Sequence, residues 1–122
     1  MISKKYLIFG GTSGIGLCLV NELLKSENNL TLVVRNIEKA NLLFHKKVKL
    51  IELDLGDSNN LLEGLNRINV ESKFDGLIYT VGIEGTFPLK SASHEKLIKY
   101  YNINTISFHI ALSFFSKKKI SN

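Results

Sequence analysis

The chain has 122 residues, of which 44% are hydrophobic and 22% are charged. This length supports one domain with a real core, and the composition excludes a disordered chain. Sixteen basic residues against 11 acidic ones give a net charge of +5, with lysines clustered at residues 46–49 and 117–119. Aromatic residues do not interleave these clusters, so we expect no nucleic-acid partner but a solvated face or attraction for an anionic ligand.

The single cysteine, Cys18, excludes an intramolecular disulfide and is typical of a reducing compartment. We expect it to be a small buried residue on a helix. An apolar run over residues 6–20 imitates a signal peptide, but glycines interrupt it and no cleavage pattern follows. The chain has no apolar stretch long enough for a bilayer, and its histidines lack metal-ligand spacing. We therefore expect a cytoplasmic protein with no metal site and no membrane contact.

Strand-like apolar runs alternate with helical periods along the chain. The pattern predicts a strand over residues 6–9, a helix over 15–24, a strand over 30–34, a helix over 36–44, a strand over 48–53, a helix over 57–68, a strand over 76–81 and a helix over 93–115. The short connections predict an open parallel sheet with helices on both faces. We expect a single domain over residues 1–122.

Two details of these helices follow from their residues. In the first helix, Ile15, Leu19 and Leu23 recur at helical spacing and predict the buried face, with Val20 and Leu24 beside them. The candidate N-caps are Asp57 or Ser58 for the third helix and Ser91 or Ser93 for the last.

The first strand-to-helix turn is rich in glycine and reads Gly-Gly-Thr-Ser-Gly-Ile-Gly over residues 10–16. Glycine permits a tight turn and lets the backbone approach a pyrophosphate, while the following helix N-terminus offers free N–H groups. Because the glycines follow a predicted strand and begin a predicted helix, they indicate a nucleotide-binding loop. We expect it to contact a cofactor through Gly10, Thr12, Ser13, Gly14, Ile15 and Gly16.

The spacing Gly10-x-x-x-Gly14-x-Gly16 resembles the short-chain dehydrogenase/reductase signature T-G-x-x-x-G-x-G, with Phe9 in place of the threonine. The resemblance implies an α/β fold, a Rossmann-like doubly wound parallel sheet, here truncated after about four strands in the order 3-2-1-4. It also implies a nicotinamide cofactor and oxidoreductase chemistry on a carbonyl or alcohol.

Other segments are similar to the family in the same order. Arg35-Asn36 begins an R-N-x-E-K stretch, and Asp54-Leu55 resembles a pair that contacts the adenine ring in relatives. Tyr79-Thr80-Val81-Gly82-Ile83 takes the place of N-N-A-G-I, with both asparagines missing, which leaves Val81 and Gly82 as candidate contacts. Asn104 resembles the family's active-site asparagine, although a polar residue satisfied within a buried helix is an equal alternative.

Arg35 bears on the choice of cofactor. It lies 19 residues beyond Gly16, where an NAD-selective domain has an acidic residue for the ribose 2′-hydroxyl. A guanidinium there pairs with a 2′-phosphate, so we expect NADP(H) rather than NAD(H). The arginine also disfavours an S-adenosylmethionine-dependent methyltransferase, and no Gly-Lys-Ser/Thr supports a P-loop.

The family's Tyr-x-x-x-Lys pair does not occur in this sequence, and residues 119–122 resemble the start of the strand that leads to its catalytic serine. We therefore expect the chain to be inactive by itself. A substrate would bind only if further chain completed the site. The last helix is apolar nearly all round between Ile106 and Phe115, which predicts a homo-oligomer. The alternative function is a non-catalytic Rossmann module for nucleotide sensing or assembly.

Overall fold

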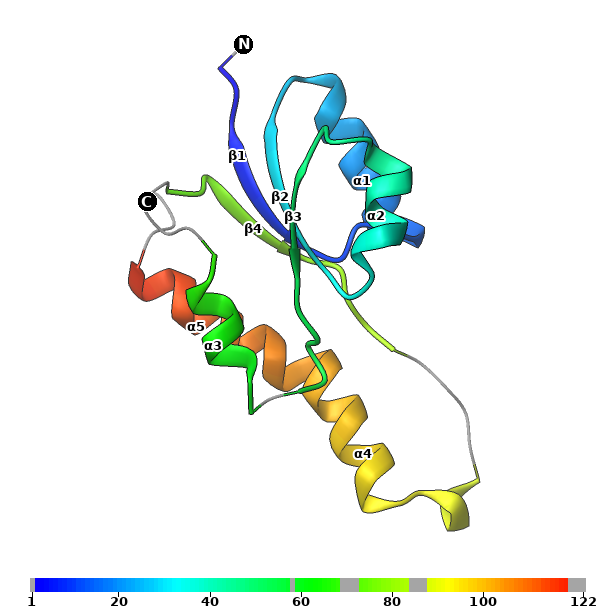
Figure 1. Cartoon of the computed structure of the whole chain (residues 1–122). Helices are drawn as coiled ribbons and strands as arrows, with labels where there is room; N and C mark the ends of the chain where they lie inside the picture. Colours follow the sequence, from blue (N-terminus) through cyan, green and yellow to red (C-terminus); the bar gives the residue numbers. More distant parts are fainter. Residues whose placement is uncertain (1, 58, 69–72, 84–87, 119–122) are drawn as a thin grey trace.

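The computed structural model describes residues 2–57, 59–68, 73–83 and 88–118, with the side chains of 117 and 118 excepted. The candidate N-cap Ser58 and the segment 119–122 lie outside the described residues. In the described part, strands and helices alternate as the sequence predicts (Figure 1).

A four-stranded parallel sheet with the order β3-β2-β1-β4 forms the centre of the molecule. Its strands are β1 (Lys5–Phe9), β2 (Asn29–Val34), β3 (Lys49–Glu52) and β4 (Gly76–Tyr79). Buried parallel strands of this kind consist of short apolar runs, which is the pattern that predicted them. The predicted Rossmann-like order 3-2-1-4 is confirmed. It places the carboxyl ends of all four strands along one edge of the sheet.

Helices cover both faces of the sheet (Figure 1). The helical elements are α1 (Gly14–Lys25), α2 (Ile37–Phe44), α3 (Leu61–Asn66), the short 3-10 turn η1 (Leu89–Ser91), α4 (His94–Tyr101), the π-helical segment η2 (Asn102–Ile106) and α5 (Ser107–Lys118). Helices α1 and α2 lie on one face, and α3 and α5 lie on the other.

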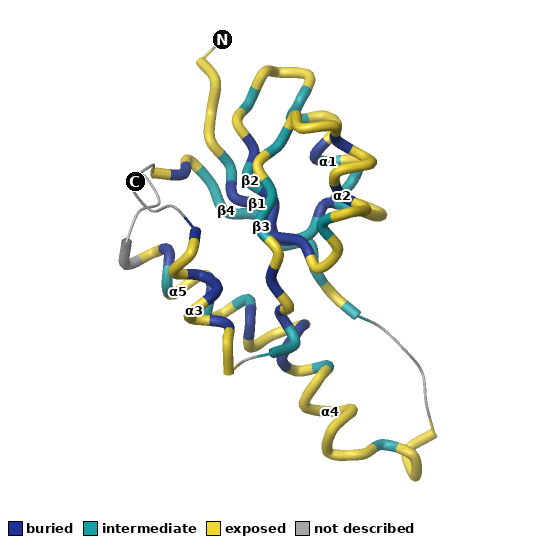
Figure 2. The backbone as a smooth tube through the Cα atoms, viewed as in Figure 1, coloured by how far each residue is buried: buried dark blue, intermediate teal, exposed yellow. Residues whose placement is uncertain are grey.

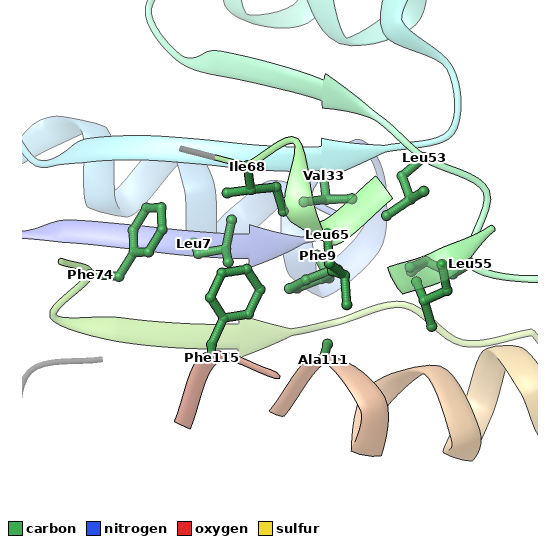
Figure 3. Close-up of a cluster of buried hydrophobic side chains, with 11 residues drawn as sticks. Leu7, Phe9, Val33, Leu53, Leu55, Leu65, Ile68, Phe74, Ala111 and Phe115 are labelled. Atoms are coloured by element: carbon green, nitrogen blue, oxygen red, sulfur yellow. The ribbon is translucent and has the colours of Figure 1, made fainter. Parts of the chain in front are cut away.

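Each face of the sheet has its own apolar core, because successive side chains of a strand point in opposite directions. In β1, Ile8 faces α1 and α2, whereas Leu7 and Phe9 face α3 and α5. Figure 3 shows the second cluster, in which Ala111 and Phe115 of α5 pack beneath these strand residues. The two cores fix the sheet between its helices, and with it the loops at the carboxyl edge.

The buried face of α1 differs from the prediction. Ile15 is 85% exposed, and the residues that contact the core are Val20, Leu23 and Leu24 with Leu17. Gly16 must face the sheet because the first turn lies close to the backbone of Gly11, so Ile15 points outward. Cys18 is exposed, and the prediction that it would be buried is wrong for the same reason.

Helix α3 begins later than the sequence predicted. Its N-cap is Asn60 rather than Asp57. The Asp57 carboxylate instead accepts a hydrogen bond of 2.7 Å from the Asn60 side chain, within successive turns that follow β3. The local asparagine–aspartate contact competes with helix formation, which is typical of these two residue types.

The predicted last helix is continuous, but it contains the π-helical segment η2 between α4 and α5. Ser93 is the N-cap of α4, and its hydroxyl accepts from the Lys96 amide at 3.2 Å, so one of the two predicted caps is confirmed. Figure 2 shows that α4 is mostly exposed, whereas buried and exposed residues alternate along α3 and α5. Among the described residues, none of the helices has the length and hydropathy that crossing a membrane requires.

Candidate functional site

The glycine loop lies at the carboxyl end of β1, the central strand next to both β2 and β4. Gly10 and Gly11 adopt φ angles of +105° and +103°, and Gly14 adopts +54°. Residues with a Cβ rarely occupy this left-handed region, so the turn requires the glycines that the sequence provides.

Close packing beneath the loop explains Gly16. A Cβ at this position would meet the Thr80 hydroxyl oxygen at 2.6 Å and the Gly11 amide nitrogen at 2.9 Å. Thr80 is held there by its own hydrogen bonds, because its amide and hydroxyl both donate to the Phe9 carbonyl, at 2.9 and 3.0 Å. The first turn of α1 is therefore fixed against the ends of β1 and β4.

The N-terminus of α1 is suited to an anion. Its N-cap, Ser13, makes no capping hydrogen bond with its side chain, and its first turn contains no acidic residue. Helices α2, α3 and α4 differ, because each carries a glutamate in its first turn: Glu38, Glu63 and Glu95. Free N–H groups and the positive end of the helix dipole are thus left without a carboxylate neighbour in the first turn of α1.

A cleft of about 410 Å³ opens at this edge of the sheet. Its walls are residues 10–13 of the glycine loop, residues 33–36 at the β2–α2 turn, residues 53–56 after β3, residues 80–83 after β4, and Ile103 from η2. Ligand clefts in proteins are of this size, and they commonly lie outside the carboxyl ends of parallel strands.

The cleft brings together most of the residues that the sequence singled out. The predicted site residues that line it are Gly10, Thr12, Ser13, Arg35, Asn36, Asp54, Leu55, Val81 and Gly82. Three others do not line it: Gly14 and Ile15 are exposed in the first turn of α1, and Gly16 is buried under the loop. Asn104 lies outside the lining, although its neighbour Ile103 belongs to it.

Arg35 and Asn36 lie where β2 ends and α2 begins. Asn36 caps the helix, and its side-chain oxygen accepts from the Lys39 amide at 3.0 Å, which leaves its side-chain NH₂ group as the donor. Arg35 is exposed, and no carboxylate among the described residues lies within ion-pair distance of it. Its guanidinium is therefore free to pair with an anion.

The opposite wall is held by two hydrogen bonds, one within the turn after β3 and one from α5. The Asp54 carboxylate accepts from the Gly56 amide at 2.8 Å, which fixes the turn after β3. The Leu55 carbonyl accepts from the Ser107 hydroxyl at 2.5 Å, and Ser107 is fully buried. Helix α5 thus supports this wall from below.

Asn104 attaches the π-helical segment to the loop after β4. Its side-chain oxygen accepts from the Ile83 amide at 2.7 Å, and its side-chain nitrogen donates to the Ile83 carbonyl at 2.8 Å. The Tyr79 hydroxyl makes a third link, donating to the Ile103 carbonyl at 2.7 Å. Burial raises the pKa of Tyr79 to about 12. Short π-helical segments are frequent at functional sites.

Lys39, Thr80 and Ile83 are not among the site residues predicted from the sequence. Lys39 and Ile83 line the cleft, and Thr80 both lines it and fixes the glycine loop. Lys39 could have been found from helical geometry, since it lies one turn beyond Arg35. The roles of Thr80 and Ile83 depend on contacts with segments far away in the sequence, and no local pattern signals them.

A second hollow of about 420 Å³ lies at the other end of the strands, and Lys5, Lys46, Lys47 and Lys49 line it together with apolar residues. The first predicted lysine cluster therefore lies at the amino-terminal edge of the sheet, away from the glycine loop. It has no direct role in the cleft described above.

A doubly wound parallel sheet whose first turn is a glycine loop, with a cleft across the carboxyl ends of its strands, defines a Rossmann-like domain. The sequence model of a family described as short chain dehydrogenase matches residues 4–118. The chain belongs to this family. A comparison with curated proteins found no significant match.

Solved structures share the fold. A bulky-bulky ketone specific alcohol dehydrogenase from Comamonas testosteroni superposes with a TM-score of 0.83 at 19% identity, over 93% of this chain and 48% of its own. ElxO with NADP bound gives a TM-score of 0.78 at 25% identity, over 95% and 50%. L-sorbose reductase from Gluconobacter frateurii, complexed with NADPH and L-sorbose, gives 0.79 at 18% identity, over 91% and 45%. The chain thus spans about half the length of these proteins.

Proposed function

We propose that the chain is the cofactor-binding part of a short-chain dehydrogenase/reductase and that it binds NADP(H) in preference to NAD(H). The observation that carries this proposal is the position of Arg35, which lines the cleft and has no carboxylate within ion-pair distance among the described residues. A guanidinium in this place binds a 2′-phosphate through two parallel hydrogen bonds, whereas NADH offers only a hydroxyl. The NADP-bound ElxO structure, at 25% identity, supports the same choice.

The rest of the cleft suits the other parts of the cofactor. The glycine loop and the N-terminus of α1 would hold the pyrophosphate, because they present backbone N–H groups near Ser13 without an acidic neighbour in the first turn. The adenine ring would lie between Arg35 and the wall formed by Asp54 and Leu55. The nicotinamide end would lie toward Gly82 and Ile83, near the segment that Asn104 attaches. The cofactor supplies hydride-transfer chemistry when it is bound.

Calorimetric titration of the purified chain with NADPH and NADH tests the preference. We expect NADPH to bind at least about tenfold more tightly, since a charge-assisted contact to phosphate contributes about 1.5–3 kcal/mol. The Arg35→Gln variant should lose most of this advantage. Equal affinities in the unmodified chain would contradict the NADP(H) preference, and no binding of either nucleotide would contradict the proposed function.

We also propose that these 122 residues do not turn over a carbonyl substrate by themselves. No tyrosine in the sequence is followed four residues later by lysine, and in relatives this pair transfers the proton. A reduction assay with NADPH and a small ketone should show no turnover. Turnover that disappears when the glycine loop is altered would refute this expectation. We further propose a cytoplasmic location, because a single cysteine is typical of a reducing compartment.

A non-catalytic assembly module is the second candidate, favoured by the exposed apolar side chains of the last helix: Leu97, Ile98, Tyr101, Ile106 and Leu112. Helix α4 has no buried residue, although it is amphipathic. Light scattering with and without NADPH separates the two functions. A homo-oligomer that is indifferent to nucleotide favours the assembly module, whereas tight NADPH binding favours the cofactor-binding part of an enzyme.

A further inference from the structure

The geometry points to Lys39 as a second cation for the 2′-phosphate, so that Arg35 and Lys39 together determine the cofactor specificity of the cleft. This inference rests on the proposed function, and it adds a specificity-determining residue to it. Three observations carry it: the lining of the cleft, the cap at the start of α2, and the distribution of charge around Arg35.

Lys39 lies on the same wall of the cleft as Arg35 and Asn36. It follows Arg35 by four residues and belongs to the first turn of α2, where its amide donates to the Asn36 side chain at 3.0 Å. This cap fixes the backbone of Lys39 next to the end of β2. The Lys39 side chain is long and exposed, and it lines the same cleft as Arg35, which places both cations where one anion could contact them.

Arg35 and Lys39 differ in the charged residues that surround them. Arg35 also borders a neighbouring hollow, so its positive charge faces two sites. Among the described residues, this hollow is lined by Arg67 and by four carboxylates: Glu52, Asp54, Asp57 and Glu63. Lys39 lines the cleft but not this acidic hollow.

The remaining nearby carboxylates do not cancel the positive charge at this wall. Glu38, the acidic residue closest in sequence, does not line the cleft. Asp54 is the one carboxylate among the described residues that line it, and one of its oxygens is engaged by the Gly56 amide. Among the described residues, the lining of the cleft thus contains the two cations Arg35 and Lys39 and the single carboxylate of Asp54. Its net charge is positive, which favours a dianionic phosphate.

Titration of the full chain with 2′,5′-ADP (adenosine 2′,5′-bisphosphate) and 5′-AMP tests this inference, because the two probes differ only in the 2′-phosphate. In Lys39→Gln we expect the affinity for 2′,5′-ADP to fall about 2- to 5-fold, as one solvent-exposed ion pair would give, and the affinity for 5′-AMP to change less than about twofold. Lys39→Arg should keep the affinity. Lys47→Gln, which removes a lysine at the opposite edge of the sheet, is the matched control and should have no effect.

Salt provides a second readout, since screening weakens contacts between exposed charges. The difference between the unmodified chain and Lys39→Gln should narrow as the salt concentration rises. If the Lys39→Gln variant keeps its affinity for 2′,5′-ADP while the Arg35→Gln variant loses affinity, the role of Lys39 is overturned and the role of Arg35 stands. An equal loss for both probes in Lys39→Gln would overturn the role of Lys39 as well. An unmodified chain that binds both probes equally would overturn the NADP(H) preference, and one that binds neither probe would overturn the proposed function itself.

Discussion

Thr80 and the glycines that surround it show how single residues shape the cleft. The threonine hydroxyl occupies the space where Gly16 would carry a side chain, and it donates to the carbonyl at the end of β1. Gly14 has a different reason to be glycine, because nothing lies within 4 Å of a Cβ there but its φ is +54°. Close contact with neighbouring atoms requires glycine at position 16, and a left-handed backbone conformation requires glycine at position 14.

These two reasons predict different costs of substitution. Gly16→Ala should lower the free energy of unfolding by about 1–3 kcal/mol, because the new methyl group meets the backbone of Gly11 as well as Thr80. Gly14→Ala should cost about 1 kcal/mol, the strain of a left-handed alanine. Denaturant unfolding of the two variants measures the difference, and a larger loss for Gly14→Ala would contradict this explanation of the loop.

Tyr79 predicts a dependence of stability on pH. Burial raises its pKa from 10.0 to about 12, so the folded protein favours the neutral phenol more than the unfolded chain does. Below pH 10 both states are protonated and the free energy of unfolding does not depend on this group. Between pH 10 and about 12 the unfolded chain releases its proton first, and stability must fall.

The matched control is Tyr79→Phe, which keeps the ring against Phe9, at a centroid distance of 5.5 Å, and against Phe108, at 5.2 Å. The gap in stability between the unmodified chain and this variant should narrow as the pH rises from 10 toward 12. A gap that is constant over this range would contradict the assigned burial of the phenol.

The π-helical segment η2 is the element that links the last helix to the loop after β4. It carries Ile103, whose carbonyl accepts from Tyr79, and Asn104, whose amide group makes two hydrogen bonds with Ile83. A regular helix over 93–115 was expected from the sequence, because the apolar residues alone do not reveal one wider turn. Through these hydrogen bonds the segment holds the loop after β4 in place. In that loop the sequence had indicated only Val81 and Gly82 as candidate contacts.

Asn104→Ala should therefore loosen the loop after β4. We expect a loss of about 1 kcal/mol in the free energy of unfolding, since the two bonds are exposed to solvent, and faster hydrogen exchange at the Ile83 amide. Asn104→Asp retains the acceptor for this amide and should protect it better than alanine does. If exchange at Ile83 were unchanged in both variants, Asn104 would not hold this loop in solution.

Across the whole chain, the sequence predicted the alternation of strands and helices, because apolar runs and glycine turns are local signals. The strand order 3-2-1-4 followed from the family resemblance, not from a local pattern. The sequence also predicted nine of the residues that line the cleft. Its errors concern side-chain direction and helix starts: Ile15 and Cys18 are exposed, and α3 begins at Leu61. The exposure of Ile15 and Cys18 depends on packing against Gly11, and the start of α3 depends on the Asp57–Asn60 contact. The hydrophobic periodicity of the sequence reveals neither of these contacts.

We propose that the carboxyl edge of this sheet is an NADP(H) site. Chemical-shift mapping of the labelled chain with NADPH and with NADH locates the residues that bind the cofactor. Both nucleotides should shift the amides of residues 10–14, and the difference between them should be confined to Arg35, Asn36 and Lys39. Shifts at Lys46, Lys47 and Lys49 instead, at the opposite edge of the sheet, would contradict the claim.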